Sequence, residues 1–257
     1  METDFLIEQR GFVLHGSFSR ERGVNSFSQG LLAKLDAFCE RIETDESIRA
    51  AIIGGSGRVF MIGSDLDQIE RGLAEPLVFQ RYLRAFNATM NRIANLPVPT
   101  VAAINGMTRA GGLEVVLACD HAIIAEEAQI GDGHSAQFAI PAGGSTQRLP
   151  RRIGVPRAKE LIWSGRFLDA REAVEWGLCD RAVPAAEVIG AAEALLATFT
   201  DKPRPCLSEI KSLILRSQTM PLHDGVELEL QAFLSYVRAH PFVSDGIAAF
   251  RERQQSA

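Results

Sequence analysis

Short apolar runs alternate with longer amphipathic segments through the first two-thirds of the chain. Runs rich in β-branched residues cover 49–54, 100–104 and 120–125, and their length is typical of buried strands. One face of a predicted helix, with a period of 3.6 residues, contains Leu31, Leu32, Leu35, Phe38, Cys39 and Ile42. The face of a second, between Pro76 and the 97–99 breaker, contains Val78, Tyr82, Leu83, Phe86, Met90 and Ile93. This alternation predicts an α/β fold in which helices cover a mostly parallel sheet.

The strand pattern stops at about Ala185, and helical segments separated by prolines follow it. We therefore expect two regions, a core over 1–184 that holds the functional site and a helical C-terminal segment over 185–257. The apolar faces of that segment need cover from another surface. Their members are Leu228, Leu230, Phe233, Leu234 and Val237.

Composition excludes several classes of function. The 257 residues carry 27 Lys and Arg against 32 Asp and Glu, a net charge of −5, with no basic run. A surface for nucleic acid or an anionic membrane is therefore not expected. Four well-separated cysteines without a C-x-x-C pair indicate reduced core thiols. The acidic N-terminus lacks the basic region of a signal peptide, so we expect a soluble cytoplasmic protein.

The common catalytic motifs do not match. Gly55-Ser-Gly57 lacks the third glycine of a dinucleotide fingerprint, because Phe60 stands there, and no phosphate-binding P-loop occurs. The stretch Gly54-Gly-Ser-Gly-Arg58 ends in arginine where a nucleophile elbow needs glycine. The five histidines show no metal-ligand spacing, so no metal site is expected.

The stretch 101–120 is the most informative part of the chain. A buried strand is followed by a glycine turn and then by Gly111 and Gly112, which open a helix that contains Glu114. Free N–H groups at such a helix start can hold an oxyanion, and the carboxylate can then face a carbonyl compound. The same pattern also fits glycines that allow tight helix packing and a solvated first-turn glutamate, so both interpretations stay open here.

Five blocks in order make the chain resemble the crotonase superfamily, the enoyl-CoA hydratase/isomerase family. Phe60-Met-Ile-Gly-Ser-Asp65 is similar to F-x-x-G-x-D, and Ala110-Gly-Gly-Leu-Glu114 is similar to G-G-G-x-E. Ile140-Pro-Ala-Gly-Gly-Ser-Thr-Gln-Arg-Leu149 follows I-P-G-A-G-G-T-Q-R-L, and Asp245-Gly-Ile-Ala-Ala-Phe250 resembles E-G-x-x-A-F. Asn25 stands where the family has an asparagine near its CoA-binding segment. The resemblance covers nearly the whole chain.

The resemblance implies roles for single residues. The oxyanion hole would take one backbone N–H from Ser64 and one from Gly111, and Glu114 would be one of two catalytic carboxylates. Arg22, near Asn25, is either a ligand of the CoA phosphates or a solvated surface arginine. We assign further substrate contacts and pocket walls to Asn25, Met61, Asp65, Leu73, Gly112 and Phe138.

The resemblance also implies an architecture and a ligand. The fold would be a spiral of ββα units whose helical C-terminal segment serves in assembly, as a trimer or hexamer, and in closing the pocket. The substrate would be an acyl-CoA thioester of fatty acid metabolism. Coenzyme A would enter as part of the substrate, and no separate cofactor is expected.

One departure from the family matters for the chemistry. Hydratases of this family carry a second glutamate in a G-x-P-E block, where this chain has Gly131-Asp-Gly-His134. His134, whose ordinary pKa is near 6.5, either replaces the second catalytic carboxylate or only plugs the pocket. Asp132 either orients His134 or ends the strand turn. Arg109 either anchors the helix start and neighbouring carboxylates or meets CoA phosphates.

These residues favour an enoyl-CoA hydratase-like lyase that adds water to an α,β-unsaturated acyl-CoA, with Glu114 and His134 as its acid–base pair. The first alternative is a hydrolase that cleaves a C–C bond of β-dicarbonyl compounds, for which a histidine base is suitable. An isomerase is less favoured because family isomerases tend to keep the carboxylate that His134 replaces. The third hypothesis is a non-catalytic acyl-CoA-binding protein.

Overall fold

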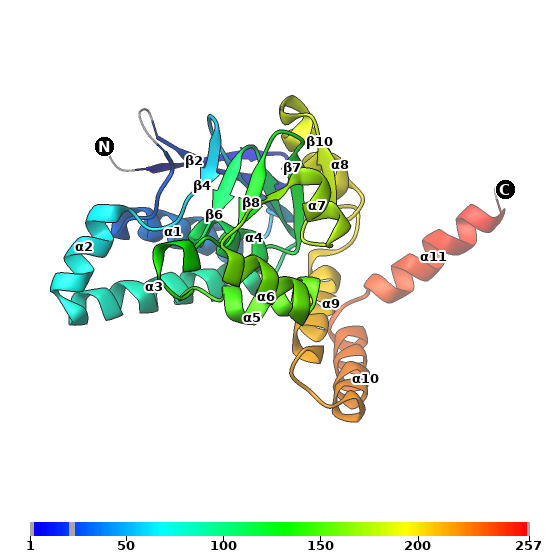
Figure 1. The fold of residues 1–257 in the computed structure, drawn as a ribbon. Helices are drawn as coiled ribbons and strands as arrows, with labels where there is room; N and C mark the ends of the chain where they lie inside the picture. Colours follow the sequence, from blue (N-terminus) through cyan, green and yellow to red (C-terminus); the bar gives the residue numbers. More distant parts are fainter. Residues whose placement is uncertain (1–2, 21–23, 256–257) are drawn as a thin grey trace.

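A computed structural model describes residues 3–20 and 24–255, and it contains two sheets over that range (Figure 1). The larger sheet has the order β1-β2-β3-β5-β7-β10, and its strands are parallel apart from the β1–β2 hairpin. They span Asp4–Arg10, Val13–Ser19, Ala50–Gly55, Thr100–Ile104, His121–Ala125 and Arg181–Val183. The smaller sheet, β4-β6-β8-β9, spans Val59–Met61, Met107–Arg109, Gln129–Gly131 and Leu168–Asp169.

Successive turns of the chain place one strand in each sheet. β3 is followed by β4, β5 by β6, and β7 by β8, with helices after the first two pairs. Those helices are α2 (Leu66–Ala74) and α3 (Pro76–Ala94) after β4, and α4 (Gly111–Ala118) after β6. The predicted spiral of ββα units is therefore confirmed. The three predicted strands agree with β3, β5 and β7 to within one residue at each end.

The periodic apolar residues of the first predicted helix form one face of α1 (Gln29–Thr44). All six are buried there, and the side chain of Ser28 accepts a hydrogen bond from the N–H of Leu31 at the helix start. This cap satisfies one of the backbone donors that a helix leaves free at its N-terminus. Sequence pattern and capping therefore specify the same helix. α3 follows the second predicted pattern, with Pro76 in its first turn.

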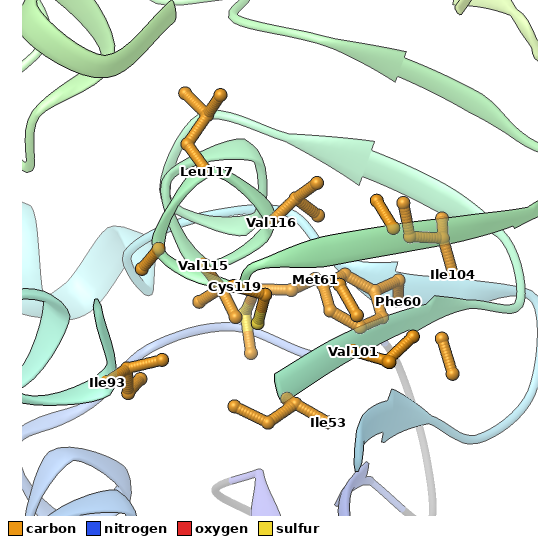
Figure 2. Close-up of a cluster of buried hydrophobic side chains, with 14 of the residues drawn as sticks. Ile53, Phe60, Met61, Ile93, Val101, Ile104, Val115, Val116, Leu117 and Cys119 are labelled. Atoms are coloured by element: carbon orange, nitrogen blue, oxygen red, sulfur yellow. The ribbon is translucent and has the colours of Figure 1, made fainter. Parts of the chain in front are cut away.

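Helix α4 is buried on every side. All eight of its residues are inaccessible, which is the expected environment of a helix that is apolar all round. Figure 2 shows Val115 of this helix close to Phe60 and Met61 of β4 and to the strand that carries Val101. A Cβ atom at Gly112 would lie 2.1 Å from the carbonyl oxygen of Met61, so only glycine allows this approach.

Three short helices follow β8 of the smaller sheet. These helices are α5 (Ser145–Ile153), α6 (Val155–Ser164) and α7 (Ala170–Glu175). Single-turn helices occur at Ser135–Gln137 and Ala185–Glu187. α8 (Val188–Ala197) packs on β3, β5 and β7 through Val188, Ala192 and Leu196, which are buried. The expected division at residue 185 is therefore too early, because apolar packing joins α8 to the sheet.

The last three helices form an arm that projects from the core (Figure 1). They are α9 (Arg204–Ser217), α10 (Leu222–Ala239) and α11 (Phe242–Gln255). A hollow of about 670 Å³ with mainly apolar walls lies between α9 and α10. Of the apolar positions predicted to need cover, Leu230, Phe233, Leu234 and Val237 are exposed in the single chain.

Two further sequence expectations concern the thiols and the membrane. Cys39, Cys119 and Cys179 are buried, and Cys206 on the arm is half-buried. Burial raises the pKa of each of the three buried thiols to about 12, which keeps them protonated. Across the described residues, no helix is both long and apolar enough to cross a bilayer.

Candidate active site

Three parallel strands of the smaller sheet end at one edge and deliver the candidate catalytic residues there. Ser64 follows β4, Gly111 and Glu114 follow β6, and Asp132 and His134 follow β8. The carboxyl ends of parallel strands are the usual place for a ligand in an α/β sheet. A cavity of about 520 Å³ opens at this edge, and Ser64, Gly111, Glu114 and His134 all line it.

The loops that hold Ser64 and Gly111 touch each other. A Cβ atom at Gly63 would lie 3.2 Å from the backbone nitrogen of Gly111, and one at Gly111 would lie 3.1 Å from the Cα of Gly63. Gly63 has a φ of +102°, a conformation that glycine adopts without strain. Neither the Ser64 nor the Gly111 N–H donates a hydrogen bond to another described residue. Two N–H groups without an acceptor among the described residues therefore lie in adjoining loops that line the cavity, which is the arrangement that an oxyanion hole requires.

Ala110 stands where the family has the first of three glycines, and its backbone is strained. Its φ of 48° and ψ of −115° lie in a region that residues with a Cβ atom rarely adopt. Its N–H donates to the carbonyl oxygen of Asp132 over 2.9 Å, which joins the β6 and β8 ends. The strain therefore lies at the point where the helix start, the oxyanion loop and the histidine loop meet.

Glu114 is 2% exposed, and one of its oxygens is already held by the backbone. Oε1 accepts hydrogen bonds from the N–H groups of Gly143 at 2.7 Å and Ser145 at 3.2 Å, at the start of α5. Burial raises the pKa of Glu114, and the charge of His134 and these two N–H groups offset only part of that rise. Oε2 makes no hydrogen bond to a described residue, which leaves it available to a ligand.

Asp132 binds His134 directly. Its Oδ1 accepts from His134 Nδ1 at 2.9 Å and from the His134 backbone N–H at 3.2 Å, and the carboxylate is fully buried. A proton on Nδ1 leaves Nε2 for the cavity. Burial acts to lower the pKa of His134, but the bond and charge of Asp132 and the charge of Glu114 outweigh it and raise that pKa. This geometry favours the orienting role of Asp132.

Asp65 lines the cavity, whereas Asn25 does not. Asp65 caps α2 through the N–H of Asp67 at 3.1 Å, and its other oxygen accepts from Ser26 Oγ at 2.9 Å. The side-chain amide of buried Asn25 donates to the carbonyl oxygens of Val59 and Phe60 at 2.9 and 3.1 Å. Asn25 therefore holds the end of β4 and acts behind the cavity wall. Arg22 lies outside the described residues.

Besides Asn25, four of the expected substrate contacts and pocket walls do not line the cavity. Met61 is fully buried in the core, and Gly112 is needed for the close approach of α4 to its carbonyl. Phe138 is fully exposed with a φ of 56°, because the turn after His134 directs the chain outward. Leu73 is exposed on α2 and lines a separate hollow between α2 and α3. These four assignments are corrected by the structure.

The sequence reasoning missed other residues that shape the cavity. Tyr82 donates to or accepts from Ser64 Oγ over 2.8 Å, so the Ser64 hydroxyl is occupied and its backbone N–H is the free donor. Burial raises the pKa of Tyr82 to about 12. Tyr82 follows the apolar period of α3 and therefore looks like a core residue in the sequence. Arg20 also lines the cavity and is bonded to Ser26 Oγ at 2.8 Å.

Part of the remaining lining is an apolar wall. It comes from the residue after β4, from α2 and α3, and from the segment before α1. The residues are Val24, Ile62, Leu66, Ile69, Leu83 and Phe86. A wall of this kind is suited to the hydrocarbon part of a ligand whose polar end reaches the N–H groups.

Comparison with known proteins adds independent observations. The family model described as "Enoyl-CoA hydratase/isomerase" matches residues 9–257. Human mitochondrial methylglutaconyl-CoA hydratase is 34% identical, with 96% of this chain and 73% of that protein covered. A probable enoyl-CoA hydratase from Bacillus subtilis is 33% identical, with 90% and 89% covered. The crystal structure of an enoyl-CoA hydratase from Bacillus anthracis matches with a TM-score of 0.91 and 34% identity over 97% of this chain and 96% of that one.

Proposed function

Because this chain belongs to the enoyl-CoA hydratase/isomerase family, we propose that it adds water to the double bond of an α,β-unsaturated acyl-CoA thioester. The observation that carries this proposal is the position of Glu114 and the Asp132–His134 pair beside two free backbone N–H groups. Hydration of an unsaturated acyl-CoA is also the reaction in the names of the relatives compared above.

The two N–H groups act on the thioester carbonyl. When water attacks Cβ, the electrons of the double bond move toward the thioester oxygen, which becomes an enolate. The N–H groups of Ser64 and Gly111 donate to that oxygen and stabilise the negative charge as it develops. This role needs only backbone donors held in place, which is what the contact between the two loops provides.

Glu114 and His134 each carry out one of the two proton transfers. Glu114, as the carboxylate, accepts a proton from water while the water oxygen bonds to Cβ. His134, as the imidazolium, donates its Nε2 proton to Cα, and the enolate returns to the thioester. Glu114 must be ionised and His134 protonated at the same time. The charge of each group favours this state, because the His134 cation acts to lower the pKa of Glu114 and the Glu114 and Asp132 carboxylates act to raise the pKa of His134.

The Asp132–His134 pair also supports a second candidate function. A histidine held by a buried carboxylate is a suitable general base, and a base of this kind serves the hydrolytic cleavage of a C–C bond in a β-dicarbonyl compound. The retained Glu114 and the free N–H groups argue against a non-catalytic acyl-CoA binder. The first function uses all of these groups, so we favour it.

A direct assay separates these functions. We expect the purified protein to hydrate crotonyl-CoA, measured as the loss of ultraviolet absorbance of the conjugated enoyl thioester. No cleavage is expected with linear or cyclic β-diketones, measured by chromatography of the products. Cleavage of a diketone without hydration of any enoyl-CoA would establish the second candidate, and binding without turnover would establish a non-catalytic protein.

We also propose that the chain assembles as a trimer or hexamer. The support is the projecting arm of α9–α11 and its exposed apolar side chains, together with the family resemblance. Light scattering of the purified protein is expected to give the mass of three or six chains. A monomer at micromolar concentration would contradict this proposal.

A further inference from the structure

Arg109 is a cation on the wall of the candidate active site, and it has no hydrogen-bond or ion-pair partner among the described residues. It is the last residue of β6, and it lines the same cavity as Gly111, Glu114 and His134. Its Nε atom is buried without a hydrogen bond, and the guanidinium makes no ion pair or hydrogen bond with any other described residue. The expected anchoring of Arg109 to neighbouring carboxylates is therefore not found.

The side chain of Arg109 is held against the histidine loop. A Cβ atom at Gly133 would lie 2.9 Å from Arg109 Nε and 3.0 Å from its Cγ. Gly133, between Asp132 and His134, has a φ of +68° and thus leaves room for the arginine stem. The positive charge of Arg109 also acts to lower the pKa of His134. Arg109 therefore lies beside the reacting groups.

Each carboxylate near this wall has at least one oxygen bonded to a group other than Arg109. Asp132 binds His134 through Oδ1, and although its Oδ2 is unpaired, no ion pair joins it to Arg109. Glu114 Oε1 is held by two backbone N–H groups. Asp65 is bonded to Ser26 and lies 3.4 Å from Arg20. A half-buried guanidinium without a partner is costly unless an anion of the ligand completes the site.

We propose that Arg109 binds a carboxylate carried by the acyl group, so that the preferred substrates are enoyl-CoA thioesters of dicarboxylic acids. This inference rests on the proposed function. The backbone of Arg109 is at most about 7 Å from that of Gly111, and its side chain packs against Gly133 beside His134, so it lies near the acyl end of the ligand. The CoA phosphates are separated from that end by the whole pantetheine arm. The planar guanidinium fork matches the two oxygens of a carboxylate.

The test compares two substrates that differ only in the distal carboxylate, crotonyl-CoA and glutaconyl-CoA. For the wild type, kcat/KM for glutaconyl-CoA is expected to exceed that for crotonyl-CoA. Arg109→Leu should lower the ratio of the two values by about 10–100-fold, the size expected for a hydrogen-bonded charge pair. If Arg109 acts only on folding or on the pKa of His134, its replacement changes kcat/KM for both substrates by the same factor. Such an effect cancels in the ratio.

Two matched variants complete the experiment. Arg109→Lys keeps the charge but not the two-pronged geometry of the guanidinium, so its ratio should lie between those of the wild type and Arg109→Leu. Arg20→Leu removes the other arginine that lines the cavity, which is already bonded to Ser26, and should leave the ratio unchanged. A wild-type ratio below one, or a ratio that Arg109→Leu does not change, would overturn the proposal. A ratio that falls in Arg20→Leu as far as in Arg109→Leu would also overturn it.

Binding measurements keep this test independent of turnover. Calorimetry with the saturated analogues glutaryl-CoA and butyryl-CoA should show tighter binding of glutaryl-CoA, and Arg109→Leu should remove that preference. If neither enoyl-CoA is hydrated but the binding preference follows Arg109, the proposed hydration fails and the carboxylate site stands. If crotonyl-CoA is hydrated and the two analogues bind equally well, hydration stands and the carboxylate site fails.

Discussion

Replacing Glu114 by glutamine is expected to lower kcat for hydration by about 10²–10⁴-fold, the range for loss of one general acid or base. The amide cannot accept a proton from the attacking water, and its side-chain oxygen can still accept from the N–H groups of Gly143 and Ser145. KM should change little, because the oxyanion donors and the apolar wall remain. Steady-state kinetics with crotonyl-CoA measures the effect.

The control for this variant is Glu126→Gln, which changes an exposed carboxylate shortly after β7. It should leave kcat unchanged. Glu114→Gln should also keep the wild-type circular dichroism and a similar Tm, because the side-chain volume and the bonds of Oε1 are retained. A folded Glu114→Gln protein with kcat within about threefold of the wild type would remove Glu114 from the mechanism.

His134→Ala is the second large expected effect, a loss of at least about 10²-fold in kcat. Without the imidazolium, the proton for Cα has to come from water. In the wild type, kcat/KM should fall as pH rises through the pKa of His134, which lies above its ordinary 6.5. This alkaline limb should be absent in His134→Ala. An acid limb that reflects Glu114, with a pKa above 4.5, should remain.

Asp132→Asn distinguishes a catalytic His134 from a residue that only fills space. Asp132 raises the pKa of His134 by its hydrogen bond and its charge, so the asparagine variant should move the alkaline limb to lower pH. His223→Ala, which changes an exposed histidine on α10, serves as the control and should leave the profile unchanged. If His134→Ala keeps full activity and its alkaline limb stays at the wild-type pH, His134 only lines the pocket.

Replacing both Glu114 and His134 should lower kcat by a factor far smaller than the product of the two single decreases. The two groups serve one proton-transfer sequence, and groups that act as a unit are not additive. A multiplicative loss would mean that the two residues act in separate steps.

The sequence predicted the fold well because local pattern and burial agree in this chain. The apolar periods of α1 and α3 and the buried runs of β3, β5 and β7 each match one element. The boundary of the C-terminal arm was less accurate, since α8 has the same apolar and helical character as the arm that follows it. Only packing on β3, β5 and β7 shows that α8 belongs to the core.

For the site, the sequence by itself determined which residue types are present and their order: Ser64, the glycines before Glu114, and Asp132 two residues before His134. The tertiary structure decided which of them meet. The side-by-side ends of β4, β6 and β8 bring Ser64, Glu114 and His134 to one cavity, whereas Met61, Gly112 and Asn25 are used in packing. It also decided that Arg109 has no ion-pair or hydrogen-bond partner within residues 3–20 and 24–255. Spacing along a chain fixes the face of a strand or helix, but contacts between strands from distant segments depend on how the whole sheet is assembled.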